Sequence, residues 1–209
     1  MGYEKIDTLY NRNPNTFKVN QDEIRREEFK SIDSWLVTEK LDGSCTCILL
    51  QEGYVKYEGH KEKSIIQPNI LKYLNSNLDP DTVASAFKAG TRVTLYGEAY
   101  GKGVQKVGEL YRPDVSFRLF DVQIEGEWLP FYGELSITSI ANKLGIKTVP
   151  VIKENCSLDQ ARAEVLGTSL VAQEEGLGCA REGIVAKTEP PVLDTEGNRV
   201  VWKLKYKDL

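Results

Sequence analysis

The chain contains 209 residues, four cysteines and one histidine, and its net charge is −4. Hydrophobic residues make up 41% and charged residues 28%, a balance that excludes a disordered tail, a collagen-like chain and a small disulfide scaffold. Because there is one histidine and no C-x-x-C pair, the common structural zinc sites are excluded as well.

The N-terminal sequence and the cysteines indicate the cellular compartment of the protein. The opening segment, MGYEKIDTLYNRNPN, contains no apolar stretch, so we expect no signal peptide. No run of ~18 apolar residues occurs anywhere, so we expect no membrane partner. Cysteines outside a disulfide framework fit a reducing compartment, which predicts a cytoplasmic protein, in the host cytoplasm if a virus encodes it.

Three strands are predicted first along the chain. Residues 35–41 alternate between apolar and polar and run into an Asp42-Gly43 turn. Residues 45–50 are apolar and β-branched, and Gly53 separates them from residues 54–58. The three segments are therefore expected to form a meander.

Two helices are predicted next. Pro68 opens the first, NILKYLNSN. Asp79-Pro80 supplies the cap and first turn of the second, which we expect to end at Gly90.

Apolar and polar residues alternate again in the middle of the chain. Residues 92–100 and 116–124 predict strands, and a turn at Glu125-Gly126 leads into a short return strand. Apolar residues at helical spacing, beginning with Leu135, predict a helix over residues 134–144 that ends at the following glycine.

The last third predicts a short strand over residues 148–152, a helix over 158–166, and two strands over 183–188 and 199–206. The elements together indicate an α+β fold of mostly antiparallel sheets with helices on the sheet faces. No linker divides the chain, so we predict a single domain over residues 1–209.

Lys40 is the first candidate for chemistry, because it ends an apolar strand beside the Asp42-Gly43 turn. A lysine is a nucleophile only as the neutral amine, and its ordinary pKa of about 10.4 must be lowered by burial or nearby cations. The alternative is a surface lysine in a hairpin turn.

Carboxylates and further lysines stand at other strand ends. Glu98 lies among glycines, Glu182 opens a strand, and Lys203 and Lys205 are two residues apart, so both point to one strand face. If these strands share one sheet, Lys40 faces two carboxylates, which can hold Mg²⁺, and two ammonium groups, which can bind phosphate. The structural alternative is a set of solvated charges at strand ends and edges.

Nucleic-acid binding by an acidic chain requires a local basic stripe. One candidate stripe covers residues 100–112, and another lies in the tail, where Trp202 and Tyr206 alternate with lysines. Phe120, which precedes Asp121 in mid-strand, can stack on a base, although a core position is the alternative.

The motifs occur in the order Lys40-Leu-Asp-Gly, Glu98, Phe120-Asp121, Glu182-Gly-Ile-Val and Lys203-Leu-Lys205. This order resembles that of the covalent nucleotidyltransferases: ATP-dependent DNA ligases, RNA ligases and mRNA-capping guanylyltransferases. The match spans residues 36–206, and TEKLDGS, GEAYGKGVQKVGELYRPDVSFRLFDV and RVVWKLKYKD look most like phage-type RNA ligases. The resemblance implies an ATP-grasp-like nucleotidyltransferase domain without the OB-fold domain of DNA ligases and capping enzymes.

The resemblance implies a three-step reaction of the kind used in RNA repair. Lys40 attacks the α-phosphate of ATP to form lysyl-AMP, the AMP passes to a 5′-phosphate end, and a 3′-hydroxyl displaces it. The implied partners are RNA ends, single-stranded or nicked, and Mg²⁺, for which Mn²⁺ can substitute. Whether a partner domain acts in trans stays open.

The resemblance also assigns nucleotide-binding roles. Thr38, through its backbone, and Glu39 would meet the adenine edge, while Phe120 and Val185 would stack on the two faces of the base. Gly43 belongs to the nucleotide-binding turn.

Phosphate and metal roles are implied in the same way. Lys203 and Lys205 would hold the α-phosphate, and Asp42 would orient the nucleophile or a water on the metal. Glu182 would be the main Mg²⁺ carboxylate, and Glu98 would contact the ribose or the metal shell.

Two departures from the family pattern keep alternatives open. Cys45 stands where many DNA ligases have arginine, which favours an RNA ligase. A second arginine expected in YEGHKEKS is missing, and His60 or Lys61 stands near its place. The alternatives are a minimal ATP-dependent DNA ligase, a guanylyltransferase and a non-catalytic nucleic-acid-binding relative.

Overall fold

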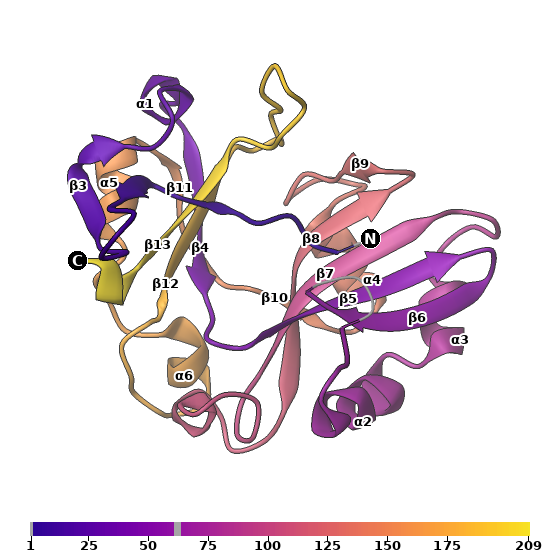
Figure 1. The fold of residues 1–209 in the computed structure, drawn as a ribbon. Coiled ribbons are helices and arrows are strands. Elements are labelled where there is room, and N and C mark those ends of the chain that lie inside the picture. Colours follow the sequence, from indigo (N-terminus) through magenta and orange to yellow (C-terminus); the bar gives the residue numbers. More distant parts are fainter. Residues whose placement is uncertain (1, 61–63) are drawn as a thin grey trace. The chain divides into compact units, whose positions relative to one another are not determined.

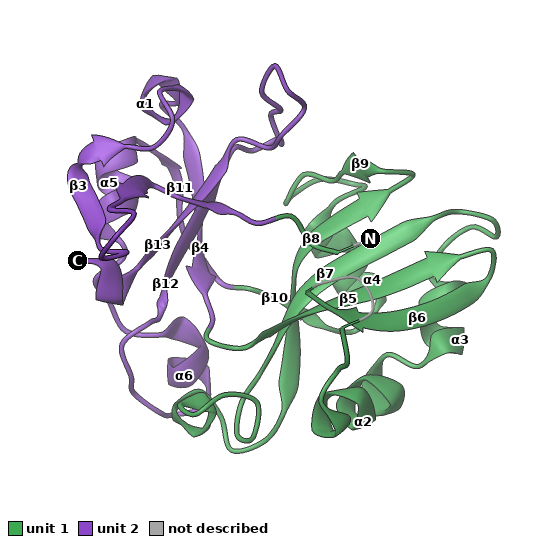
Figure 2. Cartoon of the chain, in the orientation of Figure 1, with its two compact units in different colours: residues 1–4, 42–149 green, residues 5–41, 150–209 purple. Residues whose placement is uncertain are grey.

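The computed structural model describes residues 2–60 and 64–209 and divides the chain into two compact units (Figure 2). Unit 1 contains residues 1–4 and 42–149, and unit 2 contains residues 5–41 and 150–209. Figure 1 labels most of the helices and strands in each unit. In the described ranges, no helix has the length and apolar character that crossing a bilayer requires.

Unit 1 is built on a six-stranded sheet in the order β10-β8-β7-β5-β6, with β9 paired to β8. All its pairs are antiparallel except β10 with β8. The strands are β5 (Ser44–Gln51), β6 (Tyr54–Gly59), β7 (Val93–Tyr100), β8 (Ser116–Ile124), β9 (Glu127–Trp128) and β10 (Lys147–Thr148). The helical elements are α2 (Pro68–Asn77), α3 (Pro80–Ser85), η1 (Gly108–Leu110) and α4 (Ile137–Lys143).

Unit 2 is built on a five-stranded sheet in the order β1-β13-β12-β4-β11, in which only the β1–β13 pair among the described residues is parallel. The strands are β1 (Asp7–Thr8), β4 (Trp35–Lys40), β11 (Val151–Cys156), β12 (Gly183–Lys187) and β13 (Val201–Lys205). A separate hairpin joins β2 (Tyr10–Arg12) to β3 (Val19–Ile24). The helical elements are α1 (Glu28–Ser31), α5 (Leu158–Ala163), α6 (Leu170–Glu174) and η2 (Tyr206–Asp208).

One face of the unit 2 sheet packs into a hydrophobic core. Val37, Ile184 and Leu204 are buried in it, and the rings of Trp35 and Trp202 meet edge to face with centroids 5.6 Å apart. Because successive strand residues face opposite ways, the residues between these core positions face away from the core. Trp202 was predicted to alternate with lysines on a nucleic-acid surface; that prediction is wrong, because the ring is fully buried.

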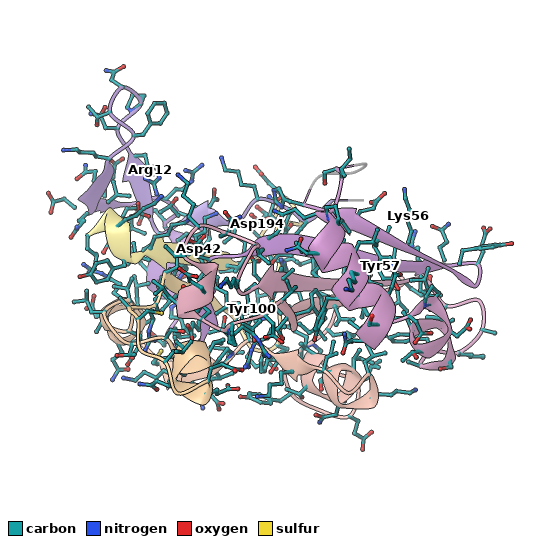
Figure 3. The ribbon with its side chains drawn as sticks, turned by 90° about the horizontal axis from the view of Figure 1, so that it is seen from below. Arg12, Asp42, Lys56, Tyr57, Tyr100 and Asp194 are labelled. Atoms are coloured by element: carbon teal, nitrogen blue, oxygen red, sulfur yellow. The ribbon has the colours of Figure 1, made fainter. Side chains whose placement is uncertain are left out.

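Hydrogen bonds between distant segments stabilise the elements within each unit, and Figure 3 labels two of the donors, Tyr57 and Arg12. In unit 1, the Tyr57 hydroxyl donates to the Leu78 carbonyl at 2.6 Å, which ties β6 to the end of α2. In unit 2, Arg12 donates to Asp208 of η2 at 2.8 Å. These bonds join segments that lie far apart in the sequence.

The expected α+β architecture with mostly antiparallel sheets is confirmed. Two helix boundaries were wrong. The helix after Asp79 ends at Ser85 rather than Gly90, although Asp79 does cap it by accepting from two backbone N–H groups. The helix predicted from residue 134 begins after the Ser136 cap, so Leu135 lies outside it and is 56% exposed.

The predicted strand over residues 148–152 is also wrong. Thr148 ends β10 in the unit 1 sheet, and Val151 begins β11 in the unit 2 sheet. Pro150 lies between them and has no N–H to offer to a ladder, which explains the break. Elements β1, β2, β3, α1 and α6 were not predicted, because each is short or lacks clear periodicity.

Candidate active site

One carboxylate bridges two lysines at the end of the unit 2 sheet. Lys40 Nζ lies 2.5 Å from Glu182 Oε2, and Lys205 Nζ lies 2.6 Å from Glu182 Oε1. The sheet register explains this, because Gly183 of β12 pairs with Lys40 on one side and with Lys205 on the other. A side chain at Gly183 would collide with the Leu204 carbonyl. The predicted association of Lys40, Glu182 and Lys205 is present in the structure.

Lys203 completes a positive sheet face. It pairs with Val185, two residues along β13 from Lys205, so the two lysines share the face that turns away from the core. Burial lowers the pKa of Lys203, and the nearby charges of Lys40 and Lys205 lower it further. Three lysines and one glutamate leave this face with two positive charges more than negative ones, which suits a phosphate ligand.

Replacing Lys203 by methionine is expected to stabilise the protein at neutral pH. Because the pKa of Lys203 is lowered in the fold, the unfolded chain binds its proton more tightly, and the free energy of unfolding rises with pH up to about 10.4. Lys203→Met removes the cost of keeping a charged lysine in this environment. The gain in the free energy of unfolding over wild type should therefore be largest at neutral pH and shrink as the pH rises. Urea unfolding at several pH values measures this, and an advantage that does not change with pH would contradict it.

Thr38 and Val185 lie on the same face. They are register partners, and the Thr38 hydroxyl donates to the Val185 carbonyl at 3.3 Å. Val185 is half-buried, so part of its side chain is open to a ligand. Their predicted adenine contacts stay predictions.

Glu39 projects to the other face of β4, where it is 1% exposed. Its Oε2 atom accepts the backbone N–H of Leu170 at 2.8 Å and of Val171 at 3.3 Å. Burial raises the pKa of Glu39, while hydrogen bonds from Ser169 and these backbone groups oppose the rise. Its Oε1 atom has no hydrogen-bond partner among the described residues. The sequence predicted a role for Glu39 but not its contacts with residues 169–171, because the short helix α6 shows no clear helical periodicity.

Glu98 lies on β7 in the unit 1 sheet, and Gly43 lies in unit 1 just before β5. The condition that all the motif strands share one sheet is therefore not met, because Glu98 and Phe120 lie in the unit 1 sheet and Lys40, Glu182, Lys203 and Lys205 belong to unit 2. Glu98 pairs with Cys45 on β5 and with Arg118 on β8. Gly43 lies so close to β7 that an added β-carbon would meet Glu98 Cγ at 2.8 Å and collide with the Ala99 carbonyl.

Gly43→Ala is expected to destabilise the protein by roughly 1–3 kcal/mol, the usual cost of overfilling a packed site. Asp42, labelled in Figure 3, precedes this glycine, and the Gln105 side chain donates to the Gly43 carbonyl at 3.1 Å, so the turn has little room to move. Gly178→Ala is the matched control, because a β-carbon there meets nothing within 4 Å. Equal stability of the two variants in urea unfolding would contradict the close contact at Gly43.

A β-bulge sets the direction of Phe120. Tyr96 pairs with Asp121 and Gly97 pairs with Leu119, so Phe120 is the extra residue in β8. Such bulges redirect side chains and are frequent beside active sites. The Phe120 ring meets the Tyr3 ring edge on at 5.0 Å, and the Tyr3 hydroxyl donates to Asp121 at 2.5 Å. The predicted stacking role of Phe120 stays a prediction.

Cys45 is a protonated thiol at neutral pH. A hydrogen bond with Cys47 raises its pKa most, followed by burial and the charge of Glu98. His60 and Lys61 stand near the position where the family pattern has a second arginine. His60 is exposed and its carbonyl accepts the Tyr3 N–H at 3.2 Å, and Lys61 lies outside the described residues.

Within the ranges that the structure describes, no three His, Cys, Asp or Glu side chains cluster closely enough to hold a metal ion.

Known proteins resemble the chain in sequence and in fold. A family model described as RNA ligase matches residues 33–205. No curated protein sequence matches the chain. A single-residue variant of Naegleria gruberi RNA ligase with ATP and Mn is similar in structure, with a TM-score of 0.68 and 20% identity over 100% of this chain and 59% of that chain.

Two further structures of the Naegleria gruberi enzyme agree. Another variant, with AMP and Mn, has a TM-score of 0.65 and 20% identity over 97% of this chain and 60% of that chain. The enzyme with PPi has a TM-score of 0.65 and 19% identity over 97% of this chain and 59% of that chain. The chain thus spans about 60% of the length of these ligases, and the likeness shows a common fold.

Proposed function

The chain belongs to the RNA ligase family, and from this premise we propose that it joins RNA ends with ATP through a lysyl-AMP intermediate. The observation that carries the proposal is the Glu182 carboxylate, which bridges Lys40 and Lys205 at 2.5 and 2.6 Å. A nucleophilic amine, Lys40, and a phosphate-binding cation, Lys205, thereby lie within hydrogen-bond distance of one proton acceptor, Glu182.

The first step forms lysyl-AMP. The neutral Lys40 Nζ attacks the α-phosphorus of ATP, an N–P bond forms, and the P–O bond to the β-phosphate breaks as pyrophosphate leaves with the electron pair. Glu182 Oε2, in contact with Nζ, accepts the proton that Lys40 loses. Lys203 and Lys205 stabilise the negative charge that develops on the phosphate oxygens.

Two transfers complete the cycle. A 5′-phosphate oxygen of RNA attacks the lysyl-AMP phosphorus, the N–P bond breaks, and Lys40 regains a proton. The 3′-hydroxyl of a second end then attacks the RNA phosphorus, a phosphodiester forms, and AMP leaves. In this proposal residues 1–209 act as one nucleotidyltransferase domain of the ATP-grasp-like kind, in the cytoplasm, where its four free cysteines stay reduced.

The residues of unit 2 fit ATP. The excess positive charge formed by Lys40, Lys203 and Lys205 matches a triphosphate, and the half-buried Val185 side chain on the same face can contact the base. Mg²⁺ usually binds nucleotides through one or two carboxylates, with phosphate oxygens and water as the other ligands. Glu182 would supply such a carboxylate in unit 2, and Glu98 is the predicted one in unit 1. When bound, the ion neutralises phosphate charge.

Sealing assays test the proposal. Single-stranded RNA, a nicked RNA duplex and a nicked DNA duplex, each with a 5′-phosphate, are incubated with the protein, ATP and Mg²⁺. We expect RNA joining or 5′-adenylylated RNA, and less product from DNA. Sealing of nicked DNA alone would identify a minimal DNA ligase, labelling by GTP instead of ATP a guanylyltransferase, and RNA binding without lysyl-AMP a non-catalytic relative.

A further inference from the structure

Phe17 is a large apolar residue that the fold holds out in solvent. It lies in the turn between β2 and β3 of unit 2 and is 72% exposed. Its backbone has a φ of 59°, in the left-handed region, which costs energy for a residue with a β-carbon and costs glycine nothing. Strained positions of this kind cluster at functional sites. An exposed ring kept at such a position therefore points to a ligand.

Hydrogen bonds fix the turn around Phe17. Its backbone N–H donates to the Asn13 carbonyl at 2.8 Å, and its carbonyl accepts from Arg12 Nη1 at 2.9 Å. The Asn13 side chain accepts the backbone N–H groups of Asn15 and Thr16 at 2.9 and 3.0 Å. The ring is therefore presented on an ordered turn, which reduces the entropy that is lost when a ligand binds.

The same hairpin is bonded to the segment that follows Lys205. Arg12, labelled in Figure 3, donates to Asp208 of η2 at 2.8 Å. The first residue of η2 is Tyr206, which is 51% exposed and whose backbone N–H donates to the Glu182 carbonyl at 2.8 Å. Two exposed aromatic residues thus lie on connected elements of unit 2, and one of these elements adjoins the proposed active site.

The charge of the hairpin tip suits a nucleic acid. Residues 10–19 contain two cations, Arg12 and Lys18, and no acidic residue, although the chain as a whole is acidic. The acidic residues of β3, Asp22 and Glu23, lie toward its other end, where the strand pairs with the start of β2. Lys18 is exposed, so its ammonium group is available to a phosphate.

Single-stranded RNA is commonly bound by aromatic rings that stack on its bases and by cations that pair with its phosphates. In a duplex the bases stack on one another and offer no face to such a ring. Resting on the proposed function, we propose that Phe17 stacks on an unpaired base of the RNA substrate and that Lys18 binds an adjacent phosphate. The hairpin thereby favours substrates with unpaired bases over continuous duplexes.

Binding of a labelled single-stranded RNA of roughly 12 nucleotides tests this contact, measured by fluorescence anisotropy. The full chain is titrated without ATP or metal, so that no reaction proceeds, and a blunt RNA duplex of the same length is titrated in parallel. Phe17→Leu keeps an apolar side chain without a flat ring, Phe17→Gly also relieves the turn, and Phe17→Trp keeps a ring. Tyr54→Ala is the matched control, because Tyr54 is an 80% exposed aromatic residue at the start of β6 in unit 1.

Phe17→Leu and Phe17→Gly are expected to bind the single strand roughly fivefold or more weakly than wild type, the effect of one lost base–aromatic stack. Phe17→Trp and Tyr54→Ala should bind it like wild type, and duplex binding should not change. Urea unfolding should show Phe17→Gly to be at least as stable as wild type, so its loss of binding does not come from unfolding. Wild-type affinity in Phe17→Leu and Phe17→Gly would overturn the inference, as it would if the ring served a partner protein instead.

The salt dependence of binding tests Lys18. Lys18→Met should reduce the slope of log affinity against log salt concentration by about 0.7, the effect of one phosphate contact with a single strand. An unchanged slope would remove Lys18 from the contact. Lysyl-AMP formation by the wild-type protein is measured in parallel. Its absence would refute the proposed function, whereas its presence together with RNA binding that does not depend on Phe17 would refute the further inference alone.

Discussion

Lys40→Arg is expected to form no covalent adduct with radiolabelled ATP, a complete loss of the first step. Arginine keeps the positive charge and can still pair with Glu182, but the guanidinium does not lose its proton near neutral pH and so is no nucleophile. Lys40→Ala should also lose the adduct. Labelling is measured on denaturing gels after incubation with α-labelled ATP and Mg²⁺.

The control for this prediction is Lys207→Arg. Lys207 is exposed, follows the last strand in η2, and has no role in the proposed reaction, so its variant should label like wild type. Labelling that persists in Lys40→Arg would move the nucleophile to another residue. Loss of labelling in both variants would show that the assay reports general damage.

Glu182→Gln is expected to slow lysyl-AMP formation by roughly 10²–10⁴-fold, the range in which a general base contributes. Glutamine keeps the size of the side chain and one acceptor oxygen, so the bridge between Lys40 and Lys205 loses its charge while the local packing stays. The proton of Lys40 then loses the Glu182 carboxylate as its acceptor. Single-turnover labelling at saturating ATP measures the rate.

Glu164→Gln is the matched control for Glu182→Gln. Glu164 accepts from Lys153 at 3.0 Å in a partly exposed pair of unit 2, outside the proposed reaction. Its variant should label at the wild-type rate. A wild-type rate for Glu182→Gln as well would remove Glu182 from the proton transfer and leave it a structural ion pair.

Local patterns in the sequence predicted the strands that carry the site. Alternating apolar residues fixed the positions of β4, β12 and β13, and a period of two then determined that Lys203 and Lys205 share a face. Lys40 and Glu182 were predicted as strand-end charges, and their contact follows from the pairing of Gly183 with Lys40. The strand positions and the alternation along them depend on neighbours in sequence, which is why local patterns predicted them. The contact between Lys40 and Glu182 joins distant segments and was expected only from the motif order shared with the nucleotidyltransferases.

Features that depend on distant segments could not be predicted. The partition of the strands into two sheets is not visible locally, since residues 148–152 form one apolar run although β10 and β11 belong to different sheets. The bulge at Phe120 is visible only once the β7–β8 register is known. The partners of Glu39 lie about 130 residues away, at Leu170 and Val171. In each case tertiary pairing decides the outcome.

The intact mass of the wild-type protein after incubation with ATP and Mg²⁺ tests the central claim most directly. The account predicts a gain of one adenylyl group, which peptide mapping places on Lys40 and which acid or pyrophosphate removes. An unchanged mass, or an adenylyl group on any other residue, would contradict it.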